Sequence, residues 1–217
     1  MIAALLAPGS LLWSQVPDTA RANRGLARLT AKLHADQTLP DSLRRLTAAD
    51  LLKPENSNHA ALLDDSTASL LLKTMAATTR QVPESLCGSF LGGSPVPAGD
   101  LDIMLPYADS STLENWLTIL ERIVRARAQP VAGRRIASDS MLRVAFLSVY
   151  ARLDTASQRR LIRVAQNPPP SRSDACWSLL AVMDGLAALP VADAGPVVRA
   201  MFGQAAAPPA KRQPGQE

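Results

Sequence analysis

Residues 111–124 read STLENWLTILERIV, and this stretch decides the fold class. Ser111 and Glu114 have the spacing of a capping box, in which each side chain binds a free backbone N–H at the start of a helix. Behind them, apolar residues recur at steps of three and four and share one helix face: Leu113, Trp116, Leu117, Leu120, Ile123 and Val124. The stretch therefore predicts an amphipathic helix that packs one face against the rest of the protein.

Helical spacing recurs on both sides of this stretch. In residues 18–34, Leu26, Leu29 and Leu33 share one face. Shorter segments of helical pattern, separated by Pro-rich and Gly-rich breaks, follow at residues 41–52, 70–79, 141–153, 155–165 and 173–187, and a final apolar segment lies at residues 196–202. Neither an internal repeat nor an alternating strand pattern occurs. The chain is therefore predicted to be all-α, an irregular multi-helix bundle of about seven to nine helices.

The spacing also predicts helix starts and inward-facing residues. Ser66, Ser111, Asp154 and Ser173 are expected to cap helices. In residues 141–153 a helix is favoured over a strand by the spacing of Leu142, Phe146, Val149 and Leu153. In residues 155–165 the residues expected to face inward are Leu161 and Ile162. The tryptophans on apolar helix faces, Trp116 and Trp177, are expected in the core.

Composition excludes several classes of protein. With 47% apolar and 19% charged residues, the 217-residue chain is folded and long enough for a real core. Two His and two Cys are too few for a zinc ribbon, an iron–sulfur protein or a multi-histidine metal enzyme. A net charge of +4 is too mild to imply nucleic acid by itself. Arg far outnumbers Lys, and Ala and Pro are abundant, as expected from a GC-rich bacterial genome.

The ends of the chain differ from its middle. Residues 1–16 are predicted to be an apolar arm packed on the domain, or a truncated export signal or anchor. Residues 17–204 are expected to form a single helical domain, and residues 205–217 a disordered tail. No apolar run is long enough for an internal membrane span.

Cys87 and Cys176 are far apart in the sequence and have no metal-ligand spacing. In a reducing cytosol they would be small buried apolar residues, whereas in an oxidising compartment they would form one disulfide. The apolar arm slightly favours the second interpretation. We therefore expect the periplasm or cell envelope somewhat more than the cytoplasm.

One motif suggests chemistry. Residues 88–103 read GSFLGGSPVPAGDLDI, which resembles the signature of polymerase-β-like nucleotidyltransferases, a Gly-Ser followed by two aspartates one residue apart. The resemblance implies that Gly88 and Ser89 approach nucleotide phosphates and that Asp100 and Asp102 hold Mg²⁺ from one strand. The alternative is a short helix at residues 100–107 with both acids in its first turn, where the helix dipole favours them.

Arginines are concentrated between residues 121 and 165. Ten lie there against three acidic residues, a net charge of +7: Arg122, Arg125, Arg127, Arg134, Arg135, Arg143, Arg152, Arg159, Arg160 and Arg163. Eight of them are a candidate basic surface, here called the basic cluster: Arg122, Arg125, Arg127, Arg134, Arg135, Arg159, Arg160 and Arg163. Such a cluster could bind an acidic protein, anionic lipid head groups or nucleic acid. Alternatively, the charges are the solvated faces of neighbouring helices.

These observations favour a non-enzymatic bacterial protein of the cell envelope that binds a protein partner and needs no cofactor. The alternative is a divergent Mg²⁺-dependent nucleotidyltransferase that uses Asp100 and Asp102. Nucleic-acid binding by the basic cluster is a further hypothesis.

Overall fold

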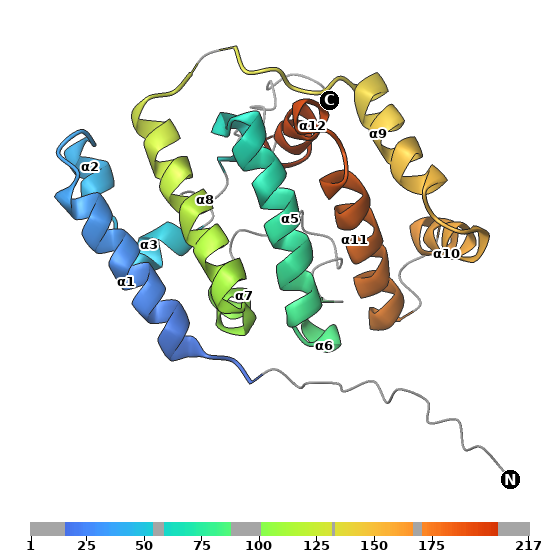
Figure 1. Cartoon of the computed structure of the whole chain (residues 1–217), viewed down its shortest axis with the longest axis horizontal. Coiled ribbons are helices and arrows are strands. Elements are labelled where there is room, and N and C mark those ends of the chain that lie inside the picture. Colours follow the sequence, from blue (N-terminus) through green and yellow to red (C-terminus); the bar gives the residue numbers. More distant parts are fainter. Residues whose placement is uncertain (1–15, 54–58, 88–100, 132, 167–170, 204–217) are drawn as a thin grey trace, which may run out of the picture.

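The computed structural model describes residues 16–53, 59–87, 101–131, 133–166 and 171–203. All regular secondary structure in these ranges is helical, which confirms the predicted all-α multi-helix bundle (Figure 1). The longer helices are α1 (Thr19–Ala35), α5 (Asp65–Gln81), α8 (Ser110–Ala128), α9 (Asp139–Ala151), α10 (Thr155–Gln166), α11 (Arg172–Ala187) and α12 (Val191–Gly203). Short turns of helix lie between them: α2 (Asp41–Arg44), α3 (Ala48–Leu52), η1 (Ala60–Leu62), α6 (Glu84–Cys87), α7 (Leu101–Met104) and η4 (Leu105–Tyr107).

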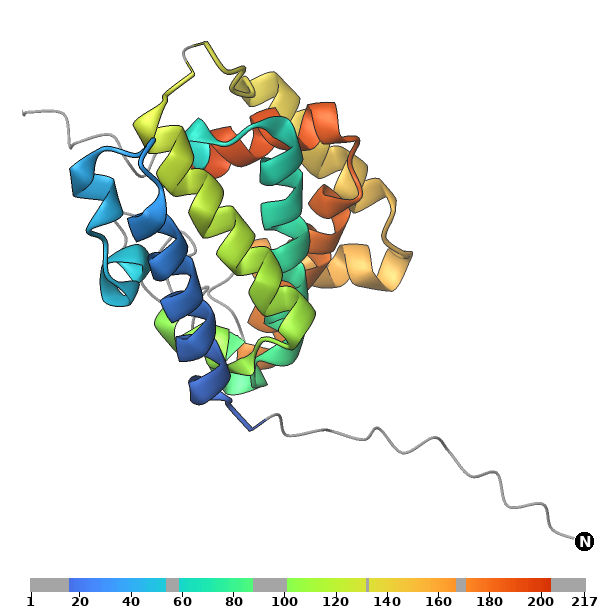
Figure 2. The ribbon, with the colours of Figure 1, turned by 60° about the vertical axis from the view of Figure 1, so that its left-hand side comes forward.

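The helices form a row whose order differs from the order of the sequence. Helices α1, α8, α5, α11 and α9 lie side by side, each in contact with the next (Figure 1). Helix α12 packs on α5, η1 and α9, and α10 packs on α11. The view in Figure 2 places α2 and α3 beside α1, so that α1–α3 form one end of the row and α9–α10 the other.

The face predicted for residues 111–124 is confirmed. All six of its apolar residues are buried, and they pack toward α1 on one side and α5 on the other. Trp116 also donates a hydrogen bond from Nε1 to the hydroxyl of Thr78 at 2.7 Å, which satisfies its polar edge within the core. The helix begins earlier than predicted, because its cap is Asp109 and not Ser111. The Asp109 carboxylate accepts from the backbone N–H of Thr112 at 2.7 Å.

Helix α12 carries a buried arginine that the sequence analysis did not identify. Arg199 is 2% exposed and donates to the carbonyls of Leu63 and Arg135, at 2.9 and 2.7 Å, and to the carboxylate of Asp65 at 2.6 Å. These bonds join α12 to the start of α5 and to the α8–α9 connection. The helix starts at Val191, so Pro196, the first residue of the apolar segment seen in the sequence, lies inside it.

Two residues predicted to face inward do not. Phe146 of α9 is 39% exposed and Ile162 of α10 is 41% exposed. Helix α9 is the last of the row, so only the side that carries Ala145 and Val149 is buried. Helix α10 contains no buried residue. Trp177 of α11 is half-buried, because α10 covers it only in part.

None of the helices in the described ranges combines the length and apolar character that a membrane span requires. The predicted arm, except Val16, and the predicted tail lie outside the described residues.

Candidate functional site

The two cysteines form a disulfide. The Cα atoms of Cys87 and Cys176 are 5.2 Å apart, and both residues are buried. The bond joins the end of α6 to the first turns of α11, two segments separated by 89 residues in the sequence. Of the two interpretations left open by the sequence, the structure shows the oxidised one, which is typical of proteins in oxidising compartments.

The nucleotidyltransferase-like motif is described only at its second aspartate. Gly88, Ser89 and Asp100 lie outside the described residues. Asp102 is exposed in the first turn of α7, and its carboxylate accepts from the backbone N–H of Ile103 at 2.9 Å. The resemblance implies strands before Gly88 and at Asp102, whereas the structure has helices α6 and α7 at these places. In the described residues no three His, Cys, Asp or Glu side chains come together as a metal site would require.

The structure distributes the basic cluster over α8, the α8–α9 connection and α10, and uses several of its members within the fold. Arg122 donates to the hydroxyl of Thr67 at 2.7 Å. Arg160 pairs with Asp174 of α11 at 2.5 Å and lies over the ring of Trp177, 4.4 Å from its centroid. The ion pair with Asp174 and the cation–π contact with the face of Trp177 therefore fasten α10 to α11.

Other members of the basic cluster have separate roles or positions. Arg135 donates to the sulfur of Met141, while its carbonyl accepts from Arg199. Arg127 and Arg134 are half-buried. Only Arg159 and Arg163 point from α10 into solvent without an ion-pair partner in the described residues. The eight arginines are therefore not one free basic surface.

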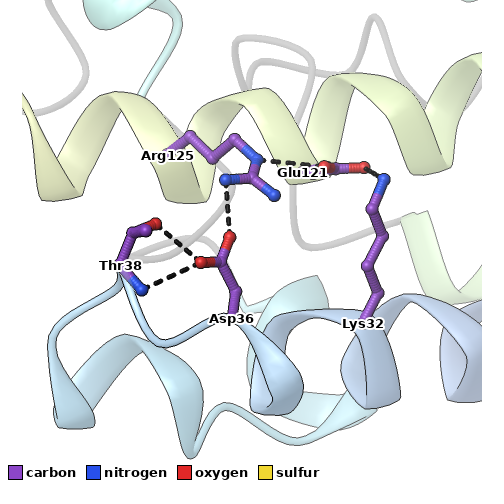
Figure 3. Close-up of polar contacts among 5 residues, drawn as sticks. All are labelled: Lys32, Asp36, Thr38, Glu121 and Arg125. Atoms are coloured by element: carbon purple, nitrogen blue, oxygen red, sulfur yellow. Dashed lines mark hydrogen bonds and ion pairs between the residues drawn. The ribbon is translucent and has the colours of Figure 1, made fainter.

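The densest group of charges joins α1 to α8 (Figure 3). Glu121 binds Lys32 at 2.7 Å and Arg125 at 3.0 Å, and Arg125 continues to Asp36 at 2.6 Å. Partial burial opposes the ionisation of Glu121, but the hydrogen bonds from Lys32 and Arg125 outweigh it and lower its pKa. Each of these charges has its counter-charge within the group, so the group stabilises the packing of α1 against α8.

The carboxylate of Asp36 is held in its charged form mainly by Thr38. The Thr38 hydroxyl and backbone N–H both donate to Oδ1 of Asp36, at 2.6 and 2.9 Å. With the further contribution of Arg125, these bonds lower the pKa of Asp36 from 3.8 to about 2. The pair closes the C-terminal end of α1, where the chain turns toward α2.

An open pocket of about 360 Å³ lies near the same end of the row and is lined by His34, Asp41, Arg44 and Arg45. Its charges are already paired, because Asp41 binds Arg44 and lies 3.9 Å from Arg45. His34 approaches the carbonyl of Leu46 at 3.3 Å. The pocket therefore has two arginines against a single carboxylate, and Asp41 offsets part of their positive charge.

The other end of the row exposes apolar side chains. On α9, Val144 is 66% and Leu147 is 59% exposed, and the exposed Ala151 continues the same face one turn further. Arg143 lies beside Val144. On α10, the exposed Ile162 lies between two arginines on its outer face. We call these residues the α9–α10 surface: Arg143, Val144, Leu147, Ala151, Arg159, Ile162 and Arg163.

The arginines of the α9–α10 surface differ from Arg28 and Lys32 at the opposite end. Arg28 and Lys32 of α1 pair with Glu114 and Glu121 of α8. By contrast, no acidic side chain in the described ranges pairs with Arg143, Arg159 or Arg163. The α9–α10 surface therefore combines exposed apolar area with unneutralised positive charge, and Figures 1 and 2 both place its two helices at the same end of the row.

Sequence reasoning found the arginines of this surface but not its apolar part. Helix α9 carries apolar residues on two sides, whereas the spacing of Phe146 and Val149 predicts a single inward face. The signal was available in Val144 and Leu147, which form a second apolar face that one buried side cannot accommodate.

Comparison with protein-family models, with curated proteins and with solved structures finds no match for this chain.

Proposed function

We propose that the protein is a non-enzymatic binding protein of the bacterial cell envelope, and that it holds a protein partner on the α9–α10 surface. The observation that carries the proposal is the exposure of Val144 and Leu147 on the last helix of the row. Exposing both side chains to water is unfavourable, and burying them against a partner would contribute roughly 1.5–3 kcal/mol per fully buried side chain. Adjacent apolar residues exposed on one helix face are typical of a binding surface.

The disulfide supports the compartment. A buried Cys87–Cys176 bond persists where no glutathione pool reduces it, as in the periplasm. It also suits a scaffold whose role is to hold a surface in place, because it fixes α11, the helix on which both α9 and α10 pack.

Site-specific photocrosslinking in source cells tests the binding surface. A benzophenone amino acid replaces Val144, and the matched control carries it at Asn23, which is exposed on α1 at the opposite end of the row. We expect a discrete protein adduct at position 144 that disappears when Leu147→Asp is added, and none at position 23. Equal labelling at both positions, or an adduct insensitive to Leu147→Asp, would contradict the proposal.

Thiol trapping in the same intact cells tests the compartment. Both cysteines are expected to resist alkylation until a reductant and a denaturant are added. If both react in denaturant without reductant, the protein is reduced in the cell and the envelope assignment is wrong.

The nucleotidyltransferase alternative and the nucleic-acid hypothesis remain predictions with their own tests. The first requires Mg²⁺-dependent nucleotide binding that is lost in Asp100→Ala, Asp102→Ala. The second requires nucleic-acid binding that weakens steeply between low and physiological salt. No described contact favours either over the α9–α10 surface.

A further inference from the structure

We infer that the partner presents an amphipathic helix whose apolar seam is flanked by Asp and Glu residues, and that this helix lies along α9. The inference rests on the proposed function and names the chemistry of the partner. It is carried by two independent properties of the α9–α10 surface, the spacing of its apolar residues and the absence of counter-charges for its arginines.

The spacing is that of a helix–helix seam. Ser140, Val144, Leu147 and Ala151 follow one another at steps of four, three and four, and all four are exposed on the same side of α9. The two larger side chains lie in the middle and the two small ones at the ends. A partner helix can therefore approach α9 closely at both ends while its own side chains pack around Val144 and Leu147.

Three arginines without an ion-pair partner in the described residues lie on α9 and α10, at the same end of the row as this seam. Arg143 precedes Val144 and lies at the edge of the seam, where side chains of paired helices meet. Arg159 and Arg163 are one turn apart on the outer face of α10. Carboxylates on the partner helix would supply the counter-charges that the described part of this chain does not provide.

Other occupants fit these observations less well. A second copy of the chain, paired symmetrically through the same surface, would bring arginines against arginines. Helices that lie on a membrane surface carry Lys or Arg beside Trp, Phe or Leu, so a membrane is separated from a partner helix by the vesicle measurement below. Nucleic acid would leave Val144 and Leu147 facing phosphates. The second copy and the membrane each have a distinct outcome in the experiment below, and the salt dependence given under the proposed function tests nucleic acid.

The experiment uses the full oxidised chain and two helical peptides of three heptads. Both peptides have the same Leu and Ala seam and a hydrocarbon staple on the far face, and they differ only in having Glu or Lys at the flanking positions. Binding is measured by fluorescence anisotropy at physiological salt. We expect the Glu peptide to bind at least about tenfold more tightly than the Lys peptide.

Variants assign the binding to the seam and to its charges. Leu147→Asp is expected to lower the affinity for the Glu peptide by about tenfold or more, since it places a charge in the seam. The triple variant Arg143→Glu, Arg159→Glu, Arg163→Glu is expected to reverse the preference toward the Lys peptide. Arg24→Glu, a matched charge reversal at an exposed position of α1, is expected to leave both affinities unchanged. Circular dichroism confirms that each variant is folded.

Three outcomes would overturn the inference. The first is equal binding of the two peptides, or no binding of the Glu peptide. The second is a dimer of the chain, seen by sedimentation, that Leu147→Asp dissociates. The third is Leu147-dependent cosedimentation with vesicles of phosphatidylglycerol and phosphatidylethanolamine when the Glu peptide does not bind. If the photocrosslinked protein adduct persists while the Glu peptide fails, the proposed function stands and only the chemistry of the partner is wrong.

Discussion

Gly185 of α11 lies so close to Val149 of α9 that a Cβ atom on Gly185 would be 2.4 Å from Val149 Cγ1 and 2.7 Å from Cγ2. Real Cβ atoms do not approach other atoms so closely, so the two helices are nearer than any other residue at position 185 would allow. Val149 is buried at this contact, on the side of α9 opposite Val144 and Leu147. The contact therefore sets the position of α9 and of the apolar seam on its outer side.

We predict that Gly185→Ala destabilises the protein, although Ala is the better helix former. The β-branched Val149 cannot rotate away freely, so α9 must shift, at a cost of about 1–3 kcal/mol in the free energy of unfolding. Urea denaturation measures the loss. The double variant Gly185→Ala, Val149→Ala removes the contacts with Cγ1 and Cγ2 and leaves only that with the Cβ atom of residue 149 at 2.9 Å, so its loss is expected to be smaller than the sum of the two single losses. A Gly185→Ala protein as stable as the parent would contradict this account.

The disulfide is expected to contribute strongly to stability. The bond constrains an unfolded chain over 89 residues of sequence separation, which corresponds to about 4–5 kcal/mol in the chain-entropy treatment. Cys87→Ala, Cys176→Ala should therefore unfold at much lower urea concentration, and reductant should lower the midpoint of the parent to the same level. Reductant is expected to leave the double variant unchanged, which provides the control. A parent protein whose midpoint does not respond to reductant would refute the prediction.

Helix content was predictable because amphipathic spacing is a local property, but three helices begin before the residues predicted for their starts. The caps expected at Ser66, Ser111 and Ser173 are in fact Asp64, Asp109 and Ser171, each two residues earlier. In all three segments several polar side chains follow one another. The residue that caps is the one whose oxygen reaches the N–H three positions on, and this depends on how the chain enters the helix. At Asp64, the carboxylate that caps also accepts a bond from the hydroxyl of Ser66.

The spacing of apolar residues shows that α9 has two apolar faces, but it does not show which of them is buried. Whether Val149 or Val144 of α9 faces the core depends on α9 being the last helix of the row, and nothing within residues 139–151 encodes that position. The burial of Arg199 likewise depends on parts of the chain that are distant in the sequence. In the sequence it interrupts an apolar segment, yet three acceptors from distant parts of the chain allow its burial.

Replacement of Arg199 is expected to be costly. Arg199→Met leaves the carbonyls of Leu63 and Arg135 without their donor inside the protein, which should lower the free energy of unfolding by about 2–4 kcal/mol. The matched control is Arg80→Met, which removes an exposed ion pair with Asp184 and should cost less than about 1 kcal/mol. Both are measured by urea denaturation at neutral pH. Equal losses in the two variants would show that the buried bonds of Arg199 add nothing to stability.

The Asp36 contacts predict a specific loss of stability in acid. Because folding lowers the pKa of Asp36 from 3.8 to about 2, the folded state favours the ionised carboxylate. The stabilisation is therefore complete above the ordinary pKa and is lost as the pH falls through the folded value. We expect the parent to be more stable than Asp36→Asn at neutral pH, with a difference that stays constant down to about pH 5 and shrinks between about pH 4 and pH 2.

The cause of the shift can be tested separately by NMR titration of the Asp36 carboxyl. Thr38→Val removes the hydroxyl donor, the largest contribution, and leaves the backbone N–H and Arg125 in place. The pKa of Asp36 should then rise toward 3.8, and the acid loss of stability should begin at higher pH than in the parent. If the pKa of Asp36 is the same with Thr or Val at position 38, the ion pair with Arg125 and not the Thr38 hydroxyl keeps the carboxylate ionised. The C-terminal end of α1 would then be stabilised mainly by this contact with α8.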